Sequence, residues 1–255
     1  MPRRSAASGS PWNSKPPTRR ETARNRPTTA RVSETMIDNV QDMTLAELRL
    51  ALAPAIADSA IFDGWGDDAL EMAAEMEGVD VDVARLAFKG GQMAMIRAWI
   101  ENVDARMTSE WPQEKLAELK IRERIRSLVR FRLDAVAGQE EAVRSALAIM
   151  SMPQNAGEGI KIGWRTADIM WRLAGDTATD YNHYTKRTIL AGIYGATLTF
   201  FINDDSEDKV ETKAFLDRRI DGVMKFEKLK AKFLNSDRET FSVTRFLGRL
   251  RYPAR

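Results

Sequence analysis

The 255-residue sequence has no cysteine and a single histidine, His183. Without cysteine the chain forms no disulfide, zinc–thiolate site or iron–sulfur centre. It also has no run of about 18 uncharged apolar residues, the length that a membrane-spanning helix needs, and no apolar block of signal-peptide length near its start. The HExxH, GxSxG, EF-hand and glycine-rich phosphate-loop motifs are missing as well. These absences predict a protein that is not an enzyme and uses no metal or cofactor of its own.

Positive charge is concentrated at the start of the chain. Residues 1–31 carry seven arginines and Lys15 against Glu21, a net charge of +7, whereas the whole chain has a formal charge of +2. Five prolines lie among Ser and Thr in this stretch, a composition that buries too little surface to fold. We therefore expect residues 1–35 to be a disordered basic leader. Three interpretations stay open: a true start at Met36 or Met43, an organelle transit peptide, or a basic arm.

From Thr44 onward apolar residues recur at helical spacing, and Gly or Pro separates the segments. The pattern predicts an all-α fold of about ten helices, with one folded domain over residues 44–235 and a last helix within 238–255. The expected helices span residues 44–59, 67–77, 80–88, 92–108, 112–138, 140–150, 160–174, 180–202, 207–234 and 238–252.

Three short helices with tight turns, followed by longer ones, are the layout of a helix-turn-helix regulator with a ligand-binding bundle. The layout resembles the TetR fold. A recognition helix needs Lys or Arg to approach DNA phosphates, yet eight acidic residues and only Arg85 lie between Asp63 and Ala87. We expect a vestigial helix-turn-helix without specific DNA binding, and we keep a TetR-like transcriptional regulator as the alternative.

A second acidic stretch comprises Asp204, Asp205, Glu207 and Asp208. It lacks the glycine and the spaced glutamate of a calcium loop. Carboxylates of this kind are common in a loop that starts a helix, and that is the role we predict for them.

Residues 167–194 put many polar groups at one helix junction, in the sequence ADIMWRLAGDTATDYNHYTKRTILAGIY. Here the chain resembles the ubiquinone-biosynthesis accessory family of TetR-like lipid-binding proteins. The resemblance extends more loosely over residues 48–229, including Gly64-Trp65. It is carried by Trp171, Ala174, Gly175, Asp176, Thr179, Asp180, Asn182, Tyr184, Thr185, Arg187, Leu190, Ala191 and Tyr194.

The resemblance implies a bundle that holds an isoprenoid or prenylated quinone lipid and docks a di-iron demethoxyubiquinone hydroxylase, where the chemistry occurs. The docking residues would be Asp180, His183, Tyr184 and Arg187. The spacing of Asp180, Tyr184 and Arg187 predicts one exposed helical stripe. Family members carry tryptophan where this chain has His183, which removes indole area from the interface. The alternative is that Gly175 ends one helix and that Tyr184 and Arg187 pack or pair locally.

A polyprenyl chain needs an apolar pocket of adaptable side chains, which Met and aromatic residues provide. The lipid-contact candidates are Trp99, Trp164, Met170, Trp171 and Phe200, with Met93, Met95, Met150 and Met152 as further pocket candidates. Met and Trp at helical spacing also form ordinary cores. A solid helical scaffold without ligand is therefore the third hypothesis.

The last helix is amphipathic. Its apolar residues share one arc, Arg245 and Arg249 face away, Arg251 flanks the arc, and no acidic residue follows Glu239. This pattern predicts reversible contact with an anionic membrane surface. The family resemblance implies that the surface is the cytoplasmic face of a bacterial inner membrane or, as the alternative, the mitochondrial matrix face. Packing back on the bundle, or a contact in a homodimer, is the alternative. The apolar arc comprises Val243, Phe246, Leu247 and Leu250.

Overall fold

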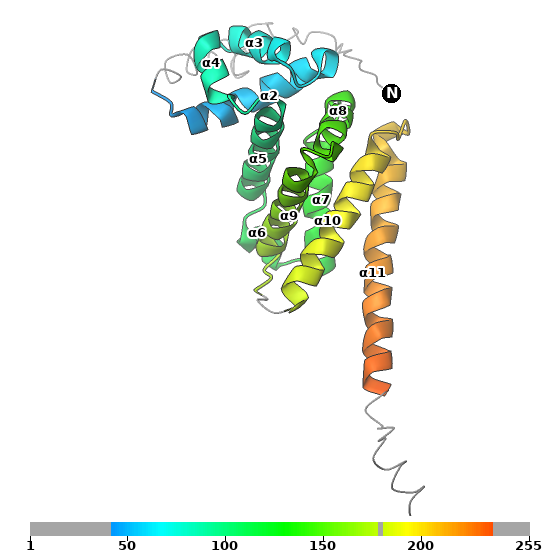
Figure 1. Ribbon diagram of the computed structural model, residues 1–255. Coiled ribbons are helices and arrows are strands. Elements are labelled where there is room, and N and C mark those ends of the chain that lie inside the picture. The colour runs from blue at the N-terminus through cyan, green and yellow to red at the C-terminus, as the bar shows by residue number, and fades with distance from the viewer. Residues whose placement is uncertain (1–41, 178–180, 237–255) are drawn as a thin grey trace, which may run out of the picture. The chain divides into compact units, whose positions relative to one another are not determined.

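The computed structural model describes residues 42–177 and 181–236 of the chain (Figure 1). Over these residues the fold is all-α, as predicted, with no strand. The predictions for residues 1–35, Asp180 and 238–255 lie outside the described residues. The helices are α2 (Leu45–Asp63), α3 (Asp67–Met76), α4 (Val81–Ala87), α5 (Gln92–Glu110), α6 (Gln113–Ala117), α7 (Ile121–Asp134), α8 (Glu140–Ser151), α9 (Ala156–Leu173), α10 (Tyr181–Phe201), the 3-10 turn η1 (Glu207–Lys209) and α11 (Val210–Ser236).

The helix expected over residues 112–138 is two helices, α6 and α7. Arg124 donates from Nη2 to the carbonyl oxygen of Ala117 at 2.9 Å and from Nε to that of Leu119 at 2.8 Å. A continuing helix would use these carbonyl groups for its own hydrogen bonds. The side chain of Arg124 therefore satisfies the end of α6, and Lys120 in extended conformation starts α7.

The helices α2, α3 and α4 pack on one another, and α2 also packs on α5 and α8 of the bundle (Figure 1). Only α3 and α4 are short, as expected; α2 has 19 residues and runs four residues past the expected end at Ser59. A capping box starts α2, because the Thr44 hydroxyl accepts from the Glu47 amide while the Glu47 carboxylate accepts from the Thr44 amide. Gly78 allows the turn before α4 with a φ of 68°. Buried Trp65 donates from Nε1 to the carbonyl oxygen of Ala142 at 2.9 Å, which ties the three-helix unit to α8.

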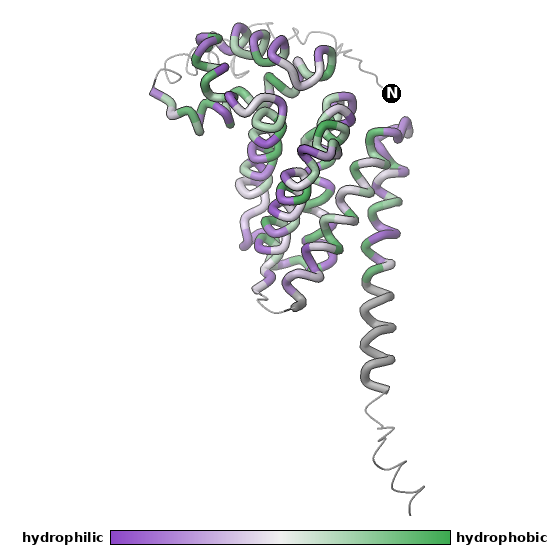
Figure 2. The backbone as a smooth tube through the Cα atoms, in the orientation of Figure 1, coloured by the Kyte–Doolittle hydropathy of each residue, from purple (hydrophilic) through white to green (hydrophobic). Residues whose placement is uncertain are grey.

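The bundle behind this unit is formed by α5 and α7 to α11, and α10 lies between α9 and α11 (Figure 1). Polar and apolar residues alternate along the coloured parts of its helices (Figure 2), as expected of helices that bury one face. The fully buried side chains of the bundle include Ile96, Met107, Leu128, Met170 and Leu190. No helix among residues 42–177 and 181–236 has the length and hydropathy to cross a bilayer.

Candidate functional site

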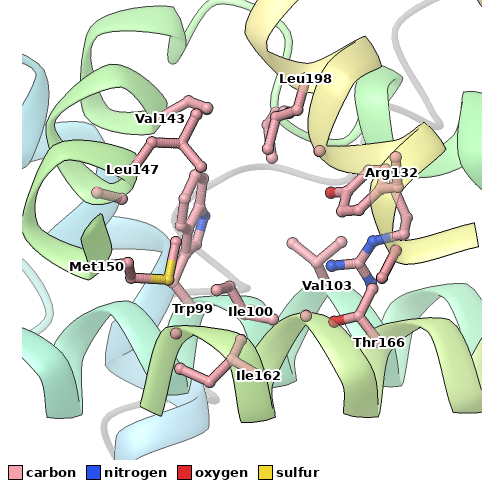
Figure 3. A pocket seen from close by; sticks show the side chains of 17 residues that line it. Trp99, Ile100, Val103, Arg132, Val143, Leu147, Met150, Ile162, Thr166 and Leu198 are labelled. Carbon is pink, nitrogen blue, oxygen red and sulfur yellow. The ribbon is translucent and has the colours of Figure 1, made fainter. Parts of the chain in front are cut away.

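A cavity of about 160 Å³ lies inside the bundle, between α5, α7, α8, α9 and α10. Its walls are mainly apolar. Figure 3 shows Val143, Leu147 and Met150 on one side, and Arg132 and Thr166 on the other. The remaining lining residues are Trp99, Ile100, Val103, Val136, Ala146, Gly159, Ile162, Gly163, Ala191, Tyr194, Gly195 and Leu198. The cavity thus has one apolar side and one polar side.

Two glycines keep the space open. Gly163 on α9 and Gly195 on α10 line the cavity, and a Cβ atom added at either position would meet no heavy atom within 4 Å. Gly159, also on the wall, is different: an added Cβ would lie 3.0 Å from the carbonyl oxygen of Met150. Gly159 therefore permits α9 to approach α8, whereas Gly163 and Gly195 leave volume for a ligand.

Arg132 supplies the charge at the polar side. It is 2% exposed, forms an ion pair with buried Asp104 of α5, and holds its guanidinium carbon 5.1 Å from the centre of the Tyr194 ring. Burial alone would lower the pKa of Arg132, but its interactions with Tyr194 and Asp104 outweigh that effect and raise it. Burial raises the pKa of Asp104, and the attraction of Arg132 opposes this only in part.

Of the five predicted lipid contacts, the structure places Trp99 on the cavity wall. Trp164, Met170, Trp171 and Phe200 do not line it. Met170 is fully buried in the core, and Phe200 stacks on Phe215 with ring centres 4.7 Å apart. Trp99 is thus the one of these five residues that lies on the cavity wall. Met150, a further pocket candidate, also lines the cavity.

The sequence interpretation missed Arg132 and Asp104. Both occupy positions on the apolar face of their helices: Arg132 follows Leu128 and Val129 at the spacing of a buried stripe, and Asp104 does the same in α5 after Ile100. Lys, Arg, Asp and Glu are almost never fully buried unless they are paired. A charged residue on the apolar face of each of two helices was therefore the available signal for a buried ion pair.

The helix junction between α9 and α10 is held by a buried network. Arg187, 1% exposed, donates from Nε to Asp168 of α9 at 2.8 Å and from Nη1 to Asp176 at 2.6 Å. Lys186 also donates to Asp176, and Trp171 donates from Nε1 to the carbonyl oxygen of Lys186 at 3.0 Å. Burial would raise the pKa of Asp176, but the hydrogen bonds from Lys186 and Arg187 outweigh this and lower it.

The expectation that Arg187 lies on an exposed stripe is therefore wrong. Its partners, Asp168 and Asp176, are themselves largely buried, with 17% and 6% of their side chains exposed, and the two ion pairs hold the guanidinium beside them. Local pairing of Arg187, the alternative interpretation, is what the structure contains. Gly175 ends α9 with a φ of 87°, and an added Cβ there would lie 3.0 Å from Nη1 of Arg124.

Three aromatic rings gather outside this network. Tyr184 is 61% exposed, and its ring centre lies 5.2 Å from that of His183 and 5.9 Å from that of Trp164. The ring centres of Trp164 and His183 are 6.4 Å apart. Trp164, a predicted lipid contact, thus lies with two of the predicted docking residues. We call Trp164, His183 and Tyr184 the aromatic patch.

The acidic stretch after α10 starts α11, in line with its predicted role. The buried Asp204 carboxylate accepts from the Ser206 amide at 2.9 Å and the Thr212 amide at 2.8 Å, and also from both hydroxyl groups. Burial would raise the pKa of Asp204, but these hydrogen bonds hold it far below its ordinary value. Within the described part of the chain no group of three or more His, Cys, Asp or Glu side chains could hold a metal ion.

Comparison with known proteins relates the chain to one family. The sequence model of the COQ9 family matches residues 156–227, which contain α9, the junction, α10 and the first part of α11. "Ubiquinone biosynthesis protein COQ9, mitochondrial" of Rattus norvegicus is 32% identical over 168 residues, which cover 63% of this chain and 54% of that protein. The Homo sapiens protein of the same name is 30% identical over 63% of this chain and 52% of its own length.

A solved structure agrees with the fold. The TetR transcriptional regulator from Nitrosomonas europaea superposes with a TM-score of 0.55 at 25% sequence identity, over 68% of this chain and 96% of that one. The chain spans about half the length of the COQ9 relatives that it matches. The matched segment contains the residues on which the family resemblance depends. The chain therefore has a TetR-like fold and is similar to the COQ9 family over residues 156–227.

Proposed function

We propose that the protein is a non-enzymatic accessory protein of ubiquinone biosynthesis, which binds a prenylated quinone intermediate and presents it to a di-iron hydroxylase. The observation that carries the proposal is the apolar cavity with one polar side, found in a chain whose relatives are named ubiquinone biosynthesis proteins. A pocket with apolar walls and few placed polar groups is typical of small-molecule binding.

The cavity is too small to enclose a whole prenylated quinone, which suits a protein that presents such a ligand to a partner better than one that stores it. At about 160 Å³ it is smaller than the roughly 300–1,000 Å³ of ordinary ligand pockets and close to the size of an engineered cavity of about 150 Å³ that binds benzene. It holds one ring or a short branched segment. The rest of a prenylated ligand would stay outside, where a membrane or a partner could cover it.

The aromatic patch is the proposed docking surface for the hydroxylase. Exposed Tyr residues are enriched in interfaces because they bury a large rigid ring and keep a polar tip. Trp164 supplies an indole beside His183, and His183 is the position at which the family resemblance implies a tryptophan. We therefore propose Tyr184, His183 and Trp164 as the contact surface, with Arg187 acting from beneath by fixing the junction.

Membrane contact is proposed for the C-terminal stripe Val243–Arg251, at the surface of the bacterial inner membrane or on the matrix face of the mitochondrial one. The relatives are named as mitochondrial proteins. Contact with the bilayer would bring the bundle to the phase in which a prenylated quinone is dissolved.

Mass spectrometry of organic extracts from the purified full chain tests the ligand. We expect an isoprenoid lipid in the wild type and in Gly192→Leu, and its loss in Gly195→Leu. Gly195 lines the cavity, whereas Gly192 lies on the same helix, is exposed, and is not part of the wall. Extracts without any isoprenoid lipid from the wild type, or equal lipid in both variants, would overturn the proposal.

The second candidate is a transcriptional regulator, favoured by the likeness to the Nitrosomonas regulator. The charge of the helix-turn-helix opposes it, because Asp67, Asp68, Glu75 and Asp82 are exposed on α3 and α4, and DNA affinity depends on neutralising phosphates. Fluorescence anisotropy with duplex DNA at moderate salt separates the two: specific binding would support the regulator.

A further inference from the structure

The buried guanidinium of Arg132 has hydrogen-bonding capacity that the protein does not use. Asp104 accepts from Nη1, but among the described residues nothing accepts from Nε, although the side chain is 98% buried. In Figure 3 the guanidinium points toward the cavity, next to Thr166 and opposite Val143, Leu147 and Met150. A buried donor without an acceptor is costly, and such groups in a native protein call for an explanation.

A hydrocarbon tail would not relieve this cost. If prenyl groups filled the cavity, methyl and methylene groups would lie against the guanidinium and leave Nε without an acceptor. An oxygenated ring of similar size would instead place its flat face among Trp99, Val143 and Met150 and turn an oxygen toward Arg132. The cavity volume of about 160 Å³ is near that of a cavity known to take a single six-membered ring.

The ion pair also sets the charge of the ligand. Asp104 already balances Arg132, so a ligand carboxylate would add an uncompensated negative charge in an apolar space. A neutral carbonyl, hydroxyl or ether oxygen accepts the same hydrogen bond without that cost.

We infer that the Arg132 side of the cavity binds a neutral acceptor oxygen of a quinone or phenol ring, so that the oxygenated ring of the ligand, and not its hydrocarbon tail, occupies the cavity. This inference rests on the proposed function and adds the orientation of the ligand to it. Arg132 would then select oxygenated rings over plain isoprenoids.

Isothermal titration of the full-length protein with three probes tests the inference. The probes are a dimethoxybenzoquinone with one isoprene unit, an isoprenyl benzene without ring oxygens, and octanoate as the carboxylate. We expect the wild type to bind the quinone about tenfold more tightly than the isoprenyl benzene, which corresponds to one hydrogen bond to a charged donor. Octanoate should bind more weakly than the quinone.

Variants assign the preference to Arg132. The double variant Asp104→Leu/Arg132→Met removes the ion pair as a unit, and should bind the quinone and the isoprenyl benzene with equal affinity. Arg132→Lys keeps a charge for Asp104 but lacks the planar fork that holds a second donor in a fixed direction, and should reduce the preference for the quinone. Thermal unfolding shows whether the double variant folds. If it does not fold, the inference is tested by Arg132→Lys and by the preference of the wild type for the quinone over the isoprenyl benzene.

The failures are distinguishable. If the wild type binds the quinone and the isoprenyl benzene equally, or octanoate most tightly, the inference is overturned while a lipid found in organic extracts still supports the proposed function. If the quinone does not bind and extracts contain no isoprenoid lipid, both fail.

Discussion

Arg187 donates from Nη1 to the carboxylate of Asp176 at 2.6 Å, and this contact fixes the start of α10 against the end of α9. The same guanidinium also donates to Asp168 on α9, so that one buried side chain connects α10 to α9 and to the loop after it. The aromatic patch lies directly outside this network. The junction therefore links the stability of the bundle to the surface proposed for docking.

We expect Arg187→Met to lower the free energy of unfolding by about 3 kcal/mol, because it leaves two carboxylates without a buried partner. Urea unfolding followed by circular dichroism measures the change. Arg172→Met is the matched control, since the side chain of Arg172 pairs with the same Asp168 but is 72% exposed, and such a pair contributes about 1 kcal/mol or less. Equal losses in both variants would contradict the role assigned to Arg187.

Periodicity predicted the all-α fold because most helices of this chain bury one apolar face and end at Gly or Pro. The same reasoning from residue spacing wrongly placed Arg187 on an exposed face. A spacing of three and four residues shows which side chains share a face, but not which way that face points. Its direction depends on Asp168 and Asp176, which lie in another helix and in the loop after it. The break between α6 and α7 has a similar cause, since Arg124 satisfies carbonyl groups several residues earlier in the chain.

The sequence predicted that a cavity exists, but not which residues line it. The composition and the family resemblance indicated an apolar pocket, and Trp99 was among the residues named for it. Which of the aromatic residues reaches the cavity depends on how five helices pack together. Trp164 packs beside Tyr184, and Phe200 stacks on Phe215, so that neither lines the cavity. Glycine positions gave no separate signal, because open and crowded glycines look alike in a sequence.

Docking at the aromatic patch predicts a specific loss. Tyr184→Ala should leave the thermal midpoint within about 2 °C of the wild type, since an exposed side chain contributes little to folding, and should weaken binding of the hydroxylase at least about tenfold if Tyr184 is an interface anchor. Surface plasmon resonance with the purified di-iron hydroxylase measures the affinity.

The control for Tyr184 is Leu86→Ala, which removes an exposed apolar side chain from α4, outside the patch. Its affinity for the hydroxylase should equal that of the wild type. An affinity that falls for Leu86→Ala and stays unchanged for Tyr184→Ala would place the docking surface on the helix-turn-helix side instead.

Asp204 predicts how stability depends on pH. Its pKa is lowered below 3.8, so the carboxylate stabilises the fold fully at neutral pH and loses this contribution as the pH falls below about 3.8. Asp204→Asn should therefore cost about 1–3 kcal/mol at neutral pH, and the difference from the wild type should shrink in acid.

Urea unfolding from about pH 7 to about pH 2.5 follows that difference across the titration of the carboxylate. Asp205→Asn, one residue further along the chain and exposed, is the matched control, because it removes a carboxylate that makes none of these four hydrogen bonds. A gap between wild type and Asp204→Asn that stays constant down to the lowest pH would mean that the carboxylate charge is not what the four hydrogen bonds stabilise.

The two kinds of cavity glycine predict opposite effects of the same substitution. Gly159 and Gly163 lie one turn apart in α9, and in both cases alanine restricts the unfolded chain and favours the helix by about 0.5–1 kcal/mol. At Gly163 nothing opposes this gain, because no heavy atom beyond its chain neighbours and the backbone of α9 itself lies within 4 Å of the new Cβ. At Gly159 the Cβ meets the carbonyl oxygen of Met150 at 3.0 Å and its Cβ at 3.2 Å, so α9 must move away from α8, at a cost of about 1–3 kcal/mol. Urea midpoints should therefore rise for Gly163→Ala and fall for Gly159→Ala. A rise in both would mean that α8 and α9 are not in close contact, and that the cavity wall they form can open without cost.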